Sequence, residues 1–470
     1  MTSGNRPNAL RGTLAGTLTN YAAGTTYQGL PDEVAERAKM IIYDQLACGL
    51  VGSALPAGKA IARYVEQLGG VRESAVLGLA GHGAPAAMAA LANGTAGHAD
   101  EFDSVHSTAD FLGTGHPAAV VVHAAAAVAE RQSLPGAELV NAVVLGYDVG
   151  SRTISSTGGL KAMESGHGLY AGSLHSIGAA FASARLLGLD QRRMLYAAAL
   201  ALSQSLNNTT FFGENRHMSK ALAEGQSASA GVSGALLAAL GFEASENVFE
   251  TRAGILDTWG APERRGELVK DLGSEFAVTG ANFKFYSAGY PIHSAVEAAL
   301  ELKSRNAVDL GAIKRIRVRL PAFPASVVND RAMPTISLQH MVAVALVAGG
   351  LGFDEAHSAS LQSSPEVLRL RSLVELTGDP DFEPSQPRGA TVSFEMSDGQ
   401  TGTEYHVDHP RGHRFREPQP TWSDLRGKWD ELLARRIGQR RSDEYFDACV
   451  SLDAVDDVTE VTAALAGARR

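Results

Sequence analysis

The chain has 470 residues, 45% hydrophobic and 20% charged, a composition typical of a folded protein with more than one structural unit. A formal net charge of −10 and the lack of any Lys/Arg-rich tract argue against nucleic acid as a partner. The two cysteines stand alone, so no zinc or iron–sulfur motif is present, and a reduced, cytoplasmic protein is expected. We expect no signal peptide and no membrane contact, because the longest apolar run, residues 118–129, is too short to span a bilayer.

Apolar residues three and four positions apart predict helices through the first 276 residues. The first clear helix covers residues 30–51, where Pro31 suits the first turn and two acids complement the helix dipole. Many of the helices are rich in alanine and glycine, which allows close packing and favours an all-helical unit. The remaining helices are predicted over residues 58–68, 86–92, 117–131, 135–152, 176–187, 192–206 and 220–240.

The pattern changes after Thr279. Residues 315–320 alternate arginine with apolar residues, as a half-buried strand does, and residues 391–407 read as a hairpin that turns at Asp398-Gly399. We therefore predict an α+β unit over residues 279–413. Helices are also predicted at residues 293–304, 337–350, 425–437 and 441–450.

Residues 93–117 place polar groups between two apolar helices. Glu101 and Asp103 could perform acid–base chemistry or bind a cation, and a charge cluster at a helix start explains them equally well. His116 precedes Pro117 at a predicted helix start, where an imidazole can meet an anionic substrate. A loop histidine bonded to backbone is the simpler interpretation of His116 taken alone.

Several cations lie outside that stretch. Lys220 stands near a helix start, against the dipole preference, which indicates either a carboxylate-binding group or a solvated turn. Lys284 lies among aromatic residues, where it lines a pocket or extends to water. Arg331 and His340 add a cation and an imidazole, although a lone helix histidine is more often structural than catalytic. Glycine-rich nucleotide loops, a serine elbow and HExxH are absent, which leaves a metal-free pocket suited to proton abstraction next to a carboxylate.

The order of motifs resembles the MmgE/PrpD family, which includes 2-methylcitrate dehydratase, cis-aconitate decarboxylase and iminodisuccinate epimerase. The resemblance implies that residues 414–470 complete the helical domain of residues 1–278, and that residues 279–413 form a smaller lid domain. The expected fold class is thus mainly α, with a large all-helical domain and an α+β lid. The resemblance further implies a homodimer, an active site between the domains, and no cofactor or metal. It rests on Asn93-Gly94, His98, Glu101-Phe102-Asp103, His116-Pro117, Gly146-Tyr147-Asp148, Gly178-Ala179-Ala180, Lys220, Gly225, Lys284, His293 and Ser337-Leu338-Gln339.

By the resemblance, His116, Lys220 and Lys284 fall on positions that line the family's pocket. The chain also departs from the family's decarboxylase, which has aspartate at the position of Glu101 and a pocket histidine at the position of Leu169. His167 lies near Leu169 but out of register. His340 stands at a tyrosine position, and Gly289 at a histidine position that Tyr290 or His293 could fill. These departures favour a reaction other than cis-aconitate decarboxylation.

We therefore expect a cofactor-independent lyase or isomerase that removes a proton α to a carboxylate of a small di- or tricarboxylate. A dehydratase of the 2-methylcitrate type ranks first, an iminodisuccinate-type epimerase second and a cis-aconitate-type decarboxylase third. A catalytically inactive binding protein is the non-enzyme alternative. The base is His116, Glu101 or Asp103. The catalytic set is His116, Glu101, Asp103 and Lys220, and the substrate-binding set is Lys284, His293, Arg331, His340, His167 and Tyr290.

Overall fold

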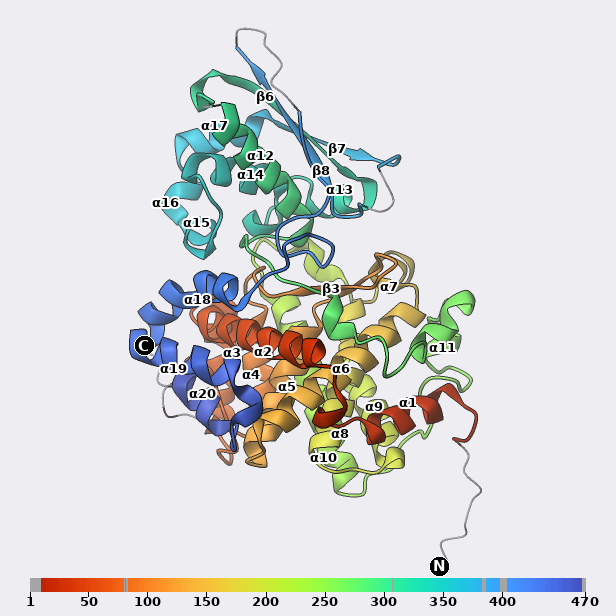
Figure 1. Cartoon of the computed structure of the whole chain (residues 1–470). Helices are drawn as coiled ribbons and strands as arrows, with labels where there is room; N and C mark the ends of the chain where they lie inside the picture. Colours follow the sequence, from red (N-terminus) through yellow and green to blue (C-terminus); the bar gives the residue numbers. More distant parts are fainter. Residues whose placement is uncertain are drawn as a thin grey trace, which may run out of the picture.

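The computed structural model describes residues 10–79, 81, 83–306, 308–382, 386–397 and 404–466. Figure 1 shows a helical body at the bottom and a smaller part with a sheet above it. The last helices of the chain return to the helical body and lie beside the early helices α2 and α3. This arrangement is the mainly α fold that the sequence predicts.

The predicted helices of the first 276 residues are all present, and most bounds agree within a few residues. One further helix, α1, precedes them, and α4 extends through Gly97, five residues past its predicted end. No single described helix is long and apolar enough to cross a membrane; α2 and α3 meet that criterion together only as a pair bent by 84°. The long helices are α1 (Leu14–Gly24), α2 (Asp32–Gly52), α3 (Pro56–Leu68), α4 (Ala86–Gly97), α5 (Pro117–Arg131), α6 (Gly136–Ser156), α8 (His175–Leu186), α9 (Gln191–Ser205) and α10 (Ser219–Ala239).

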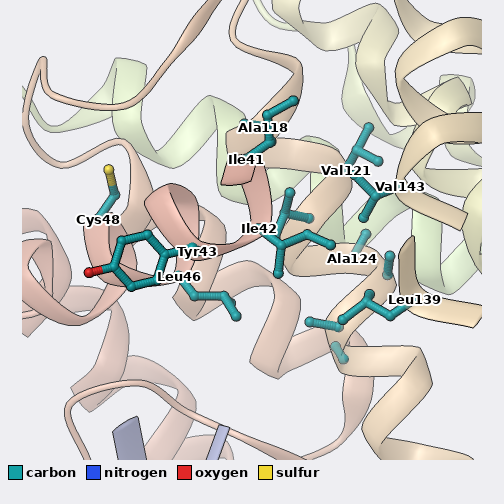
Figure 2. Close-up of a cluster of buried hydrophobic side chains, with 14 of the residues drawn as sticks. Ile41, Ile42, Tyr43, Leu46, Cys48, Ala118, Val121, Ala124, Leu139 and Val143 are labelled. Atoms are coloured by element: carbon teal, nitrogen blue, oxygen red, sulfur yellow. The ribbon is translucent and has the colours of Figure 1, made fainter. Parts of the chain in front are cut away.

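Helix α5 lies in the centre of the helical body, and thirteen of its residues from Ala118 to Glu130 are buried. Figure 2 shows Ile42 of α2 among Val121 of α5 and Leu139 and Val143 of α6. These side chains are fully buried, so removing such apolar surface from water stabilises the contact between the three helices. Small residues such as Ala124 let the helix axes approach closely.

The C-terminal helices α18 (Trp422–Ile437), α19 (Gln439–Val450) and α20 (Thr459–Ala466) share the core of the helical body. The buried indole of Trp429 donates a 2.7 Å hydrogen bond to Asp44 of α2. The phenol of Tyr445 donates to the carbonyl of Tyr43 at 2.6 Å. These contacts join residues 385 and 402 positions apart and attach the chain's end to α2.

The upper part has its own apolar core, which draws on residues between Ala288 and Val407. Its four-stranded sheet has the order β7-β6-β8-β9, with β6 parallel to β7 and antiparallel to β8. The predicted hairpin is the antiparallel pair β8–β9, and its predicted turn, Asp398-Gly399, lies outside the described residues. The strands are β6 (Ile313–Pro321), β7 (Val374–Asp379), β8 (Ala390–Met396) and β9 (Tyr405–Val407), covered by α12 (His293–Asn306), α14 (Leu338–Ala348) and α17 (Pro365–Leu373). We call this part the lid.

The prediction of a purely helical body is wrong in one respect, because short strands occur between its helices. β1 (Ser74–Ala75) pairs with β2 (Gly83–Ala84), and β3 (Val105–Ser107) pairs with both β4 (Gly113–Gly115) and β5 (Ala281–Asn282). Strands of two or three residues are too short to show alternation in the sequence. Shorter helices are α7 (Gly159–Lys161), α11 (Ile255–Thr258), α13 (Ala322–Val328), α15 (Phe353–His357) and α16 (Ala359–Gln362).

Candidate active site

The small sheet β4-β3-β5 gathers three polar side chains at one of its ends. Strand β3 runs antiparallel to both neighbours, and its first residue, Val105, pairs with the last residue of β5. The next residue of β3 pairs with the last residue of β4. Asp103 precedes β3, His116 follows β4 and Lys284 follows β5, so the register brings all three to the same end of the sheet.

The carboxylate of Asp103 lies between two imidazoles. His116 Nδ1 is 2.9 Å from Asp103 Oδ2, and His98 Nδ1 is 3.0 Å from Asp103 Oδ1. A carboxylate only accepts hydrogen bonds, so both Nδ1 atoms carry the proton and both Nε2 atoms are left with a lone pair. Gly115, at φ +94°, makes the turn that brings His116 back to the carboxylate, a conformation that favours glycine.

Burial and charge fix the protonation states of this pair. Burial raises the pKa of Asp103, but the His116 and His98 imidazoles outweigh it and hold that pKa well below its ordinary value. Burial lowers the pKa of His116, and Asp103 only partly offsets it. At neutral pH the pair is therefore a carboxylate and a neutral imidazole, which is the state of a general base.

Glu101 bridges two lysines. Lys220 donates to Glu101 Oε1 at 2.6 Å, and Lys284 donates to Oε2 at 2.9 Å. The three side chains are nearly or fully buried, with Lys284 at 0% exposure. Burial opposes ionisation of Glu101, but the two ammonium groups hold the pKa of Glu101 well below its ordinary value. Glu101 is thus an internal anion that satisfies both cations.

A close helix crossing places Lys220 beside Glu101. A Cβ on Gly225 of α10 would lie 2.4 Å from the carbonyl oxygen of Leu91 in α4, and a Cβ on Gly94 would lie 2.9 Å from Gly225 Cα. Only glycine allows this approach of the two backbones. The crossing sets the first turn of α10, with Lys220, next to the loop that follows α4.

Asp100, the third acid of the polar stretch, lies apart from this cluster. Its Oδ2 accepts a 2.5 Å hydrogen bond from Ser287, and its Oδ1 is 3.1 Å from His357 Nε2. Burial opposes ionisation of Asp100, but His357 and Ser287 lower its pKa overall. Because Ser287 and His357 lie between residues 279 and 413, Asp100 connects the helical body with the lid.

A cavity of about 110 Å³ opens beside the cluster, between the helical body and the lid. Helical-body residues His116, Glu101 and Lys220 line one part of it, and lid residues such as Tyr290 line another. The apolar part of the remaining wall comes from Val105, Leu160, Phe212, Phe323, Val327, Val328 and Ile336, and its polar part from His106, Glu164, Tyr170 and Arg388. A concave site with a few polar groups in an apolar wall is the usual form of a small-molecule site.

One carboxyl group in the cavity wall and one behind the wall favour the protonated form. Burial raises the pKa of Glu164, in the cavity wall, to about 7. Tyr170, also in the wall, donates a hydrogen bond to Glu224, and burial raises the pKa of Glu224 to about 8. Glu224 lies one helical turn after Lys220 on α10, so the two side chains share a helix face. The site thus offers proton donors as well as a base.

Arg388 supplies a further cation to the cavity wall. Its guanidinium lies over the Tyr290 ring, 5.5 Å from the centroid, and has no carboxylate partner in the described part of the chain. Burial lowers its pKa, although arginine stays charged at any working pH. An unpaired guanidinium in a cavity is suited to hold a substrate carboxylate.

Two groups of side chains have the spacing of a cation site, namely His98, Asp103 and His116, and His98, Glu101 and His217. Their two carboxylates already lie beside two lysines, with Lys284 Nζ 2.9 Å from Glu101 and 3.9 Å from Asp103. The two lysines therefore neutralise the two carboxylates. The cluster has no net negative charge that would attract a divalent cation.

Comparison with known proteins agrees with this architecture. The model of the MmgE/PrpD N-terminal domain matches residues 16–265, and that of the MmgE/PrpD C-terminal domain matches residues 286–452. The chain belongs to the MmgE/PrpD family.

Relatives of this MmgE/PrpD protein extend over almost the full chain. The cis-aconitate decarboxylase-like protein oryM of Aspergillus oryzae is 29% identical, over 97% of this chain and 98% of its own length. Cis-aconitate decarboxylase of Aspergillus terreus is 27% identical, over 94% of both chains. Cis-aconitate decarboxylase of Homo sapiens is 26% identical, over 93% of this chain and 91% of its own length.

The structure brings together the predicted catalytic set of this MmgE/PrpD protein. His116, Glu101 and Lys220 line the cavity, and Asp103 lies behind His116. Among the predicted substrate-binding residues, Tyr290 lines the cavity, and Lys284 reaches the cluster through Glu101.

The other predicted substrate-binding residues lie outside the cavity wall. His293 is buried and bonds through Nε2 to the carbonyl of Ala288 at 3.0 Å. Arg331 donates to the carbonyl of Phe212. His340 is 5% exposed within α14. His167 is exposed, and the neighbouring Leu169 forms an isolated bridge with Asn208. As the chain is folded here, these four side chains do not contact the candidate substrate space.

Other residues of the site were not predicted. His98 and Glu224 had a local signal, since His98 lies in the polar stretch and Glu224 lies four residues after the predicted Lys220. Arg388 and Tyr170 had none, because they lie in irregular segments without a motif. Their position in the wall depends on how the lid sits over the helical body.

Proposed function

We propose that this protein is a cofactor-independent lyase that acts on a small di- or tricarboxylate, with dehydration of a 2-hydroxy acid as the reaction. Family membership and relatives named as decarboxylases support a lyase for small carboxylates in general, and they do not favour a dehydratase specifically. The observation that carries the proposal is the Asp103–His116 pair, 2.9 Å apart, at a cavity that also contains Lys220.

The first step is removal of the proton α to a carboxylate. Asp103 holds the Nδ1 proton of His116, so the Nε2 lone pair of His116 is the one available to take the substrate proton. Asp103 then stabilises the imidazolium that forms. Lys220 and Arg388 bind substrate carboxylates, and their positive charge stabilises the enolate-like charge that develops next to a carboxylate.

The second step is departure of the hydroxyl group. A hydroxide ion is a poor leaving group, so a nearby acid must protonate it. Glu164 is suited to this role, because burial raises its pKa to about 7 and it lines the same cavity. The C–O bond breaks as the proton arrives, and water and the unsaturated acid are released.

Two other outcomes begin with a similar carbanion. Reprotonation on the opposite face gives an epimerase, and loss of CO₂ in place of proton abstraction gives a decarboxylase. The decarboxylase is the second candidate, because four relatives of this chain carry that name. The departures at Glu101, Leu169 and Gly289 argue against the decarboxylase and favour neither the dehydratase nor the epimerase over the other. We also propose that the protein is a homodimer, as the family resemblance implies, which light scattering of the purified protein would test.

The test is incubation of the purified protein in D₂O with 2-methylcitrate, cis-aconitate and iminodisuccinate, followed by NMR. An alkene product from 2-methylcitrate is expected. CO₂ release from cis-aconitate without dehydration of 2-methylcitrate would establish the decarboxylase instead. Ligand binding without any turnover or α-proton exchange would refute the enzyme and favour the binding protein. Full activity of His116→Gln would refute the base assignment.

A further inference from the structure

A second hollow, of about 280 Å³, adjoins the candidate active-site cavity. The two share Leu160, Phe323 and Arg388 in their walls, so they meet where these side chains lie. We call the second hollow the side groove. Apart from the shared residues, its wall is mainly apolar and includes Phe111, Leu112, Pro321, Pro324, Phe382 and Pro387.

The side groove is built from both parts of the molecule. Phe111 and Leu112 come from the loop between β3 and β4, whereas Phe382 comes from the lid. The aromatic rings of Phe111, Phe323 and Phe382 are only partly buried, so each leaves apolar surface that a ligand could cover. Lys161 also lines the groove, with its ammonium 5.9 Å from the centroid of the Phe323 ring.

The apolar wall continues into the cavity itself. Val327, Val328 and Ile336 line it on the lid side, whereas the charged side chains of the cavity occupy other parts of the wall. A substrate carboxylate placed against these three apolar side chains would lack hydrogen bonds there, which is unfavourable. An alkyl substituent would instead remove apolar surface of both partners from water.

We propose that the substrate is a polycarboxylate that carries an alkyl chain longer than methyl, and that the side groove binds this chain. This inference rests on the proposed function. The carboxylates bind at Lys220 and at Arg388, which stands at the junction of cavity and groove. The chain leaves the cavity between Leu160 and Phe323 and lies against Phe382. The base and acid groups are the same as for a short substrate.

The expected effect of chain length follows from the transfer of methylene groups from water. Each buried methylene improves binding by about fourfold, so kcat/KM rises by about that factor per carbon until the chain fills the groove. Three added methylenes thus give an increase on the order of 60-fold. A substrate with a charged or strongly polar substituent in place of the alkyl chain should show no increase in kcat/KM.

The experiment compares 2-methylcitrate, 2-butylcitrate and 2-hexylcitrate as substrates of the wild-type protein and of Phe382→Asp. The wild type should show kcat/KM rising with chain length, and Phe382→Asp should lower the hexyl-to-methyl ratio at least tenfold. Phe382→Ala, a milder change in the same wall, should lower that ratio in the same direction. The matched control is Phe242→Asp, because Phe242 is 57% exposed and lies after α10, outside both hollows.

If the wild-type kcat/KM stays constant or falls with chain length, the groove does not bind the chain. Equal hexyl-to-methyl ratios of kcat/KM in Phe382→Asp and Phe242→Asp would refute the proposal as well. Calorimetric binding of hexylsuccinate and succinate tests the groove without turnover. Tighter binding of hexylsuccinate that Phe382→Asp abolishes would support the groove even if no citrate reacts, whereas equal binding would refute it. Turnover of 2-methylcitrate without any chain-length effect would leave the proposed function standing and reject the groove alone.

Discussion

Asp103→Asn is the substitution that separates the base mechanism from a purely structural role of the polar cluster. The side chain of Asp103 is fully buried and accepts hydrogen bonds from Nδ1 of both His98 and His116, at 2.9 to 3.1 Å. Asparagine keeps the shape but has one acceptor oxygen and one donor amide group. One imidazole must therefore lose its acceptor or move its proton to Nε2. Where that imidazole is His116, the lone pair that faces the substrate is lost.

The magnitude follows from these contacts. Losing a correctly oriented base lowers kcat by about 10² to 10⁴-fold, which corresponds to about 3 to 5 kcal/mol of activation free energy. Leaving one buried N–H without an acceptor lowers the free energy of unfolding by about 1 to 3 kcal/mol. The pKa of Asp103 is lower in the folded than in the unfolded state, so its carboxylate stabilises the fold above about pH 4, and this stabilisation disappears as the pH falls towards the folded-state pKa.

The assay measures turnover and α-proton exchange at pH 7, together with chemical unfolding between pH 3 and pH 8. We expect kcat to fall while KM changes little, and the stability difference from wild type to be constant near pH 7 and to shrink at the acid end. Asp330→Asn is the control, because the side chain of Asp330 is 71% exposed in a surface ion pair with Arg371. Asp103→Asn with wild-type turnover would refute the role of Asp103, whatever its stability.

Three further outcomes are expected. In pH-rate measurements, kcat/KM should fall above about pH 7, where Glu164 loses its proton. Glu164→Gln should lower activity about 10²-fold and abolish this decrease of kcat/KM at high pH. Burial raises the pKa of Glu224 to about 8 in the folded state, from about 4.5 in the unfolded state. Protonated Glu224 therefore favours the folded state fully below about pH 4.5, and this contribution to stability is lost as the pH rises to about 8. Glu224→Gln should raise the melting temperature at pH 8 and leave it nearly unchanged at pH 4. Arg388→Gln should raise KM at least tenfold with a smaller effect on kcat, whereas Arg411→Gln, at an arginine that is 55% exposed, should leave both parameters unchanged in steady-state kinetics.

Much of the fold is readable in the sequence because long helices repeat their pattern over many residues. Helices α5 and α10 begin and end within one or two residues of their predicted bounds. Their apolar and small residues are determined by burial, and burial leaves a periodic signal. The small sheet β4-β3-β5 was not predicted, because its strands have only two or three residues and one of them lies 170 positions from the others.

Only part of the candidate site could likewise be read from the sequence. His116, Lys220 and Lys284 were candidates mainly by motif order, because each of them taken alone also has a structural interpretation. Their partners could not be read in this way. Asp103 and Glu101 are two residues apart, yet one orients an imidazole and the other binds two lysines.

The sequence by itself thus determined the helical body, the lid and the chemical groups available in residues 93–117. Only the tertiary structure decided how those groups are paired, because hydrogen-bond geometry depends on strand register and helix crossing rather than on spacing along the chain. It also decided that Arg388 and the side groove join the cavity, since their walls combine loops of the helical body with the lid. Contacts between segments hundreds of residues apart leave no local pattern, and in this protein those contacts form the site.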